Sequence, residues 1–116
     1  MKPAQRPVRL NRPLMLETPL RAPDGAGGFS RGWVALGMVW ARVDARSGRD
    51  LDGMGAALSR VRLRITTRAA PPGSSMRPTP EQRFREGNRV FAIRAVREWD
   101  AEGRYLVCEA EEEVAR

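Results

Sequence analysis

Residues 60–68 alternate between basic or polar and aliphatic side chains, in the order Arg-Val-Arg-Leu-Arg-Ile-Thr-Thr-Arg. Successive side chains of a β-strand point to opposite faces, so Val61, Leu63 and Ile65 share one face and the arginines share the other. The pattern predicts a strand whose aliphatic face is buried. The guanidinium groups keep their charge at physiological pH, and they must therefore face water, acidic groups or phosphate.

Four other short apolar runs, bounded by glycine and proline, predict strands at residues 14–20, 33–43, 88–99 and 104–110. Gly37 interrupts the second of these runs, which indicates a bend or a bulge there. In the third run, apolar residues fall on both faces, which is typical of a closed or sandwiched sheet. The sequence therefore predicts an all-β fold, a small β-barrel or sandwich of five to six strands with long projecting loops.

The remaining segments predict loops and terminal extensions. Residues 69–82 contain four prolines and a Gly-Ser-Ser run, which exclude a regular helix or strand. This segment is either a disordered connector or a functional projection. The polar, glycine-rich residues 44–59 predict a loop with one helical turn. Residues 1–13 predict an extended basic arm, 14–110 a single barrel domain, and 111–116 an acidic tail.

The inward faces of the predicted strands define a core. Trp40 lies near the end of the longest apolar run, just before residues 41–43, where its ring is expected to anchor the edge of the core. Cys108 lies in an apolar run and is expected to be a buried structural thiol. The predicted core residues are Val61, Leu63, Ile65, Val39, Trp40, Phe91, Ile93, Leu106 and Cys108.

Composition narrows the chemistry. The formal net charge is +7, and Lys2 is the one lysine among 21 basic residues. This balance fits either GC-rich codon usage or contact with phosphate and carboxylate groups. Histidine is absent and Cys108 is the single cysteine, which excludes an internal disulfide, a Cys/His zinc site and His-dependent triads. The chain carries no combination of groups typical of an enzyme or a cofactor site, so we predict neither.

No segment is apolar for long enough to span a bilayer, and we expect a cytoplasmic protein without a membrane partner.

Four stretches, taken in order, resemble the phage head–tail joining family, also called head-closure or stopper proteins. They are the turn Asp-Gly-Ala-Gly-Gly at 24–28, Val-Trp-Ala at 39–41, the alternating strand at 61–68, and the pair of segments at 83–93 and 106–109. The resemblance covers about residues 10–110. The arginine-rich style is similar to versions carried by alphaproteobacterial prophages and gene transfer agents.

The resemblance implies a structural protein of the particle neck. Members form a cyclic homo-oligomeric ring, expected here as a hexamer or dodecamer, below the portal and adaptor ring and above the tail terminator or tail tube. They help retain packaged double-stranded DNA in the channel. The protein is then expected in the neck of a virion or gene transfer agent particle, assembled in the host cytoplasm. A cyclic ring needs two different patches on each subunit.

The charged segments supply candidates for these patches. We expect acidic and basic segments of neighbouring subunits to pair. The ring-interface candidates are Arg60, Arg62, Arg64, Arg68, Glu109, Glu111, Glu112 and Glu113, with Arg6, Arg9 and Arg12 of the basic arm. The channel-loop candidates are Arg46, Arg49, Asp50, Asp52 and Met54, and the projecting-loop candidates are Ser74, Ser75, Met76 and Arg77.

Other interpretations stay open. The arginine face can be a solvated outer surface, or it can contact DNA directly. A small nucleic-acid-binding β-barrel is the alternative function. Such barrels interleave basic residues with stacking aromatic rings. Trp33, Trp40, Phe91 and Tyr105 fall at core-like positions in the predicted strands, which argues against such a platform.

Overall fold

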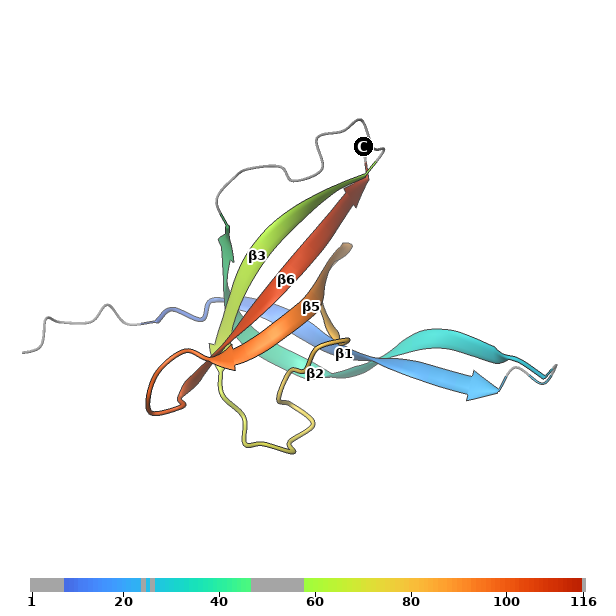
Figure 1. The fold of residues 1–116 in the computed structure, drawn as a ribbon, viewed down its shortest axis with the longest axis horizontal. Coiled ribbons are helices and arrows are strands. Elements are labelled where there is room, and N and C mark those ends of the chain that lie inside the picture. Colours follow the sequence, from blue (N-terminus) through green and yellow to red (C-terminus); the bar gives the residue numbers. More distant parts are fainter. Residues whose placement is uncertain (1–7, 24, 26, 47–57, 116) are drawn as a thin grey trace, which may run out of the picture.

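The computed structural model describes residues 8–115 apart from 24, 26 and 47–57. These residues form six antiparallel strands and contain no helix. Around a closed barrel the strand order is β1-β2-β3-β6-β5-β4 (Figure 1). The strands are β1 (Arg12–Pro23), β2 (Phe29–Ala45), β3 (Leu58–Arg68), β4 (Arg83–Glu86), β5 (Arg89–Glu98) and β6 (Tyr105–Ala115). The all-β prediction is confirmed.

The core fills the barrel with side chains from the inward rows of its strands. Leu14 and Leu16 of β1 meet Phe84 of β4, and Ile65 of β3 meets Cys108 of β6. Side chains alternate across each strand, so every second residue enters this core. These aliphatic and aromatic groups are fully buried. Removal of their apolar surface from water is the main contribution to the stability of the domain.

Two bulges reconcile the sequence pattern with the barrel. Leu16 pairs with Gly37 and Glu17 with Ala35, so Leu36 is an extra residue in β2. This confirms the irregularity expected at Gly37. In β5, Ile93 pairs with Ala110 and Ala95 with Glu109, so Arg94 is extra. An extra residue shifts the alternation by one position.

The bulge in β5 explains the mixed apolar pattern of that strand. Phe91 and Ile93 precede Arg94 and point inward at odd positions. Val96 follows Arg94 and packs against the same core from an even position. The bulge moves the inward positions of β5 from odd to even residue numbers. A single inward face therefore appears in the sequence as two partly apolar faces.

Both terminal boundaries differ from the prediction. β1 begins at Arg12, so residues 12–13 belong to the barrel rather than to a basic arm. β6 continues to Ala115, so the acidic residues 111–113 are strand and not a tail. Each of these glutamates has a register partner on β3, which lets the ladder continue past residue 110.

Segment 69–82 is a folded cover rather than a disordered connector. Ile93 N donates to Gln82 O at 3.0 Å, and Arg77 Nη1 donates to Ala70 O at 2.8 Å. Pro78 is buried. The Met76 sulfur and methyl group lie so near Gly37 that a Cβ added there would be 2.9 Å from both. The segment leaves the end of β3 as a loop, and its return limb is fastened to the barrel (Figure 1).

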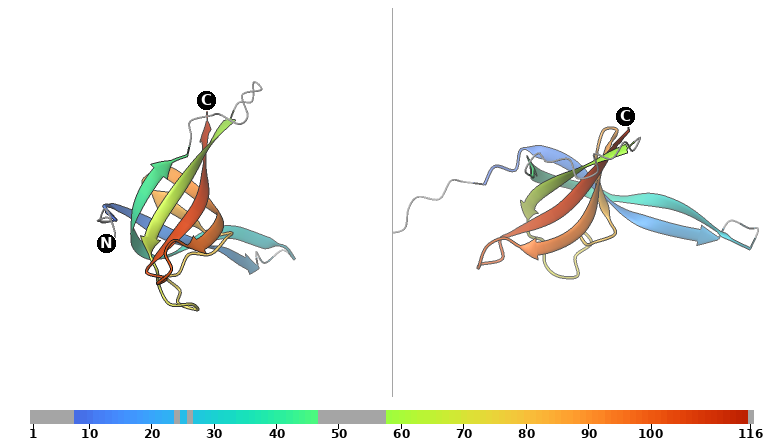
Figure 2. Two further views of the ribbon diagram at one scale, coloured as in Figure 1. Left: turned by 60° about the vertical axis from the view of Figure 1, so that its left-hand side comes forward. Right: turned by 45° about the horizontal axis from the view of Figure 1, so that its top comes forward.

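The β1–β2 hairpin extends well beyond the barrel. β1 pairs with β4 only from Met15 to Glu17, and β2 pairs with β3 only from Ala41 to Ala45. We call residues 18–23 and 29–35 the arm, which is a different segment from the basic arm predicted at residues 1–13. Figure 2 shows that the arm projects from one side of the barrel in both further views.

Candidate assembly surfaces

The outer wall of the barrel brings the arginine ladder and the acidic residues together within one chain. β3 and β6 are neighbours, and their register places Arg60 opposite Glu113, Arg62 opposite Glu111 and Arg64 opposite Glu109. Opposite charges on facing positions of neighbouring strands stabilise a sheet. Among these three facing pairs, an ion pair within the subunit joins Arg64 and Glu109, and pairing between neighbouring subunits stays a prediction.

Glu109 is the centre of this charged wall. Arg46 Nη1 donates to Glu109 Oε1 at 2.7 Å, and Arg97 Nη1 donates to Glu109 Oε2. Arg64 Nε lies 3.7 Å from the same carboxylate. Partial burial raises the pKa of Glu109, but the hydrogen bonds from Arg97 and Arg46 outweigh burial and leave the pKa below its ordinary value.

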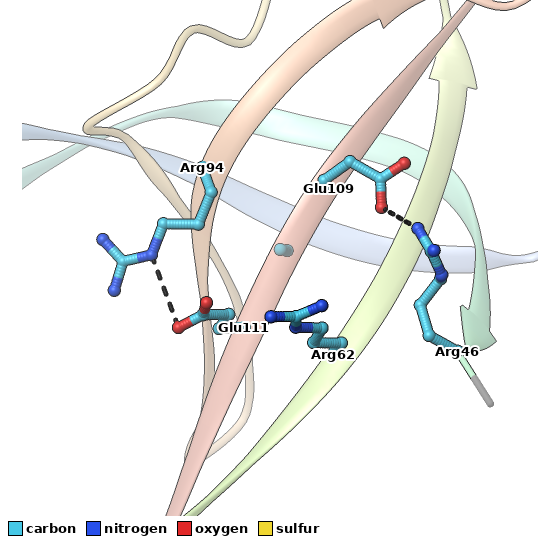
Figure 3. A pocket seen from close by; sticks show the side chains of 6 residues that line it. Arg46, Arg62, Arg94, Glu109 and Glu111 are labelled. Carbon is cyan, nitrogen blue, oxygen red and sulfur yellow. Dashed lines mark hydrogen bonds and ion pairs between the residues drawn. The ribbon is translucent and has the colours of Figure 1, made fainter. Parts of the chain in front are cut away.

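Figure 3 shows the shallow depression between these side chains, with Glu109 and Arg46 on one side of it and Arg94 and Glu111 on another. Arg94 Nε lies 3.6 Å from Glu111 Oε2. Arg62 points into the same depression and makes no ion pair with any described residue. Arginine and glutamate side chains thus alternate on this wall, and the arginines outnumber the glutamates. The wall is not a surface of unpaired arginines alone.

One end of the barrel interior is charged instead of apolar. At this end the inward rows carry Arg12 of β1, Glu86 of β4, Arg89 of β5 and Glu112 of β6. Arg12 Nε donates to Glu86 Oε2 at 3.0 Å, and the hydrogen bond from Arg12 lowers the pKa of Glu86. Arg12 and Glu112, expected at a ring interface, are therefore occupied in an internal network.

A second ion cluster fixes the root of the arm. Glu17 is 6% exposed and accepts hydrogen bonds from Arg83 Nε at 2.7 Å and Arg85 Nε at 2.9 Å. Burial raises the pKa of Glu17, yet the bonds from Arg85 and Arg83 bring it below the ordinary value. The Arg83 guanidinium also stacks over the Trp33 ring at 4.0 Å. Sequence reasoning missed this cluster, because Glu17 lies 66 and 68 positions from Arg83 and Arg85 in the chain.

Two predicted core residues are wrong. Trp40 is 51% exposed, because it lies on the outer row of β2 opposite Pro13. Val61 points inward but is 38% exposed, because it lies past the apolar layer at the charged end of the barrel. Val39 packs on the core from a partly buried position. The other predicted core residues are buried, namely Leu63, Ile65, Phe91, Ile93, Leu106 and Cys108.

The exposed apolar side chains gather on β1 and β2. Of the seven large apolar residues that are exposed in the described part of the chain, five lie on these two strands: Leu20, Trp33, Val34, Met38 and Trp40. Trp33 and Trp40 were expected at core-like positions, and the structure corrects that expectation. A concentration of exposed apolar groups on one element marks an interaction site.

Several further candidates can now be placed. Arg68 is exposed with its Cζ 5.9 Å from the Tyr105 ring centroid, and Arg9 is exposed just before β1. Ser75 is exposed, whereas Ser74, Met76 and Arg77 are partly buried. The residues Arg6, Arg49, Asp50, Asp52 and Met54 lie outside the described part of the chain.

The described residues hold no group of three or more side chains arranged to bind a metal ion. Among them there is also no helix of the length and apolar character needed to cross a membrane.

Comparison with known proteins assigns the chain to a class. The profile of the phage head completion protein family matches residues 6–113. The chain therefore belongs to the phage head completion protein family and is a structural head–tail component. No curated protein sequence matches it.

A solved structure narrows this class further. The chain is similar to a protein in the virion of a native gene transfer agent particle, with 54% identity and a TM-score of 0.81. The match covers 96% of this chain and all of that one. The resemblance inferred from the sequence, to head–tail joining proteins of gene transfer agents and prophages, is confirmed.

Proposed function

We propose that the chain forms a ring at the neck of a tailed phage or gene transfer agent particle. In this role it joins the portal and adaptor above to the tail terminator or tail tube below, as a hexamer or dodecamer. The ring narrows the channel and helps to retain the packaged double-stranded DNA. The role is structural and not catalytic, and assembly takes place in the host cytoplasm.

The observation that carries this proposal is the arm. An isolated two-stranded ribbon is at best marginally stable in water. The arm nevertheless exposes Leu20, Trp33 and Val34 by 38% or more. Exposed apolar groups gathered on one element are typical of a surface that another protein covers, and a neighbouring subunit of a closed ring provides such a cover.

Family membership and the similar gene transfer agent protein support the same role. Within the proposed ring, the segment with Arg49, Asp50, Asp52 and Met54 is our choice for the channel-facing loop. Segment 69–82 is fastened along its return limb, which makes it a weaker choice for a projection into the channel.

Electron microscopy of particles made without this chain tests the proposal. We expect heads that package DNA but lose it, together with unattached tails, and restoration of both by the wild-type chain. Intact tailed particles filled with DNA would show that the chain has no neck function.

A nucleic-acid-binding barrel is the second candidate, favoured by one observation. Arg60 and Arg62 are exposed and form no ion pair with a described residue, so their donors are free for phosphate. Titration with single-stranded DNA discriminates the two functions. Tight, salt-dependent binding with quenching of the exposed tryptophans supports the second candidate. Weak binding removes it.

A further inference from the structure

The arm is open to a partner on both faces. Thr18 pairs with Val34, so Leu20 and Val34 share one face, while the pair Pro19 and Trp33 lies on the other. Leu20 is 48% exposed and Trp33 is 42% exposed. A partner that buries only one face would leave large apolar groups in water. The arm therefore fits between two surfaces or along a groove of its partner.

The barrel carries a second exposed apolar surface, which we call the aromatic belt: Trp40, Arg68, Tyr105 and Trp99. Arg68 is the register partner of Tyr105. The Trp99 ring meets the Tyr105 ring edge to face with centroids 5.8 Å apart. Since Ala41 pairs with Thr67, Trp40 is the neighbour of Arg68 on the same outer face.

The composition of the aromatic belt is that of a protein contact. Tryptophan, tyrosine and arginine are the side chains that most often dominate binding energy at interfaces. Trp40 and Trp99 are each 51% exposed. The two half-exposed tryptophans, with the exposed Arg68 and the partly buried Tyr105 between them, offer a contact surface across β2, β3, β6 and the end of β5.

The arm and the aromatic belt lie on different sides of the barrel. In Figures 1 and 2 the arm projects to one side, while the β5–β6 turn and the end of β3 lie on the other. Two unlike surfaces on opposite sides are the requirement for a head-to-tail contact that repeats around a ring.

Charge also favours contact between the two surfaces. The strands of the arm beyond Glu17 contain Arg21 and Arg31 and no acidic residue. The turn beside the aromatic belt contains Glu98, Asp100 and Glu102, of which Glu98 and Glu102 are exposed. Arg104 pairs with Asp100 at 3.0 Å and lies 3.8 Å from Glu102, so three acidic residues and one arginine leave residues 98–104 with a net charge of −2. Complementary charge at the edge of an interface directs the approach and disfavours wrong partners.

We propose that the arm of one copy lies across the aromatic belt of the next copy, so that the partner of the arm is a second copy of this chain. The proposal rests on the ring function and specifies which surfaces make the ring. Each subunit then contributes its arm to one neighbour and its aromatic belt to the other.

Chemical cross-linking of particles tests this contact. The variant Val34→Cys with Ala101→Cys places one thiol on the arm and one in the β5–β6 turn, both at exposed positions. A short bismaleimide applied to purified particles is expected to give a ladder of this chain beyond the dimer. The native Cys108 is buried, and burial raises the pKa of its thiol to about 12, so it adds no background.

Two further variants make the result decisive. Val34→Cys with Asn88→Cys moves the second thiol to the exposed β4–β5 turn and is expected to give no ladder. Ala35→Cys with Glu102→Cys repeats the test from the other face of the arm, should the first pair disturb assembly. A ladder specific to the turn variants supports the proposal.

Three results overturn the proposal. They are the absence of cross-links, a product that stops at the dimer, and a product in which the arm is joined to a different virion protein. Electron microscopy of the same particles shows separately whether the chain occupies the neck. A failed cross-link can therefore be told apart from a failed ring function.

Discussion

Arg89 and Glu112 are joined by two hydrogen bonds, Nε to Oε2 at 2.8 Å and Nη2 to Oε1 at 2.9 Å, at the charged end of the barrel interior. This paired geometry matches the planar fork of arginine to both carboxylate oxygens. Glu112 is 8% exposed, so its carboxylate is largely shielded from water and receives these hydrogen bonds from Arg89 in its place.

Glu112→Gln is expected to destabilise the barrel. The amide keeps the shape of the side chain but removes the charge and one acceptor, which costs about 1–3 kcal/mol of unfolding free energy. Urea denaturation followed by circular dichroism measures the change. The matched control is Glu113→Gln, on the neighbouring exposed position of the same strand, where we expect a change below about 0.5 kcal/mol. Equal effects of the two substitutions would contradict a special role for the Arg89 pair.

The fold is expected to lose stability in acid. Hydrogen bonds from arginines hold the pKa values of Glu17, Glu86 and Glu109 below the ordinary value. A carboxylate with a depressed pKa stabilises the fold fully above its unfolded pKa, near 4.3, and this contribution is lost as the pH falls through the folded value. Unfolding free energy should therefore be flat from pH 7 to about pH 5 and fall below it.

The variant Glu17→Gln isolates one part of this acid dependence. It removes one titrating group, so its unfolding free energy should fall less steeply below pH 5 than that of the wild type. Urea denaturation at several pH values measures both curves. Parallel curves would exclude Glu17 as a contributor.

Gly37 allows the cover segment to approach the barrel. Its φ is +155°, and a Cβ there would lie 2.9 Å from the Met76 sulfur and methyl carbon. Gly37→Ala is expected to cost about 1–3 kcal/mol through crowding and backbone strain. Combining it with Met76→Ala should recover part of the loss, because only the crowding is relieved. Strictly additive losses in the double variant would show that the two residues do not interact.

Cys108 is expected to be inert in the folded protein. Burial raises its thiol pKa from an ordinary value of 9.0 to about 12, which lowers the thiolate fraction by about three orders of magnitude. Reaction with a chromogenic disulfide at pH 8 should be negligible in buffer and rapid in denaturant. Fast reaction of the folded chain would contradict a closed barrel wall around β6.

The all-β fold could be predicted from the alternation in β3 and from the glycine and proline residues that separate the strands. Leu63 and Ile65 are buried because strict alternation on a barrel strand leaves each residue one possible face. Val61 follows the same alternation, yet it is exposed, because alternation gives the direction of a side chain and not how far the core extends along the strand.

The surfaces could be predicted less well, and for a physical reason. Trp40 has the composition of a core residue, and only the register with Pro13 and the bulge at Leu36 put it outside. The facing of the acidic residues and the arginine ladder depends on β3 lying beside β6, although the facing residues are 45 to 53 positions apart in the chain. Neither fact can be read from local sequence, because both depend on how the barrel closes.

The two outer edges of the arm carry unpaired backbone groups. Such edges in other proteins recruit further strands and grow into fibrils. β1 includes Pro13, Pro19 and Pro23, residues without an N–H group, which are typical of edge strands that resist extension. The bulge at Leu36 further breaks the regular spacing of β2. These features protect the free chain against uncontrolled polymerisation, and in the proposed ring they leave recognition between copies to side chains.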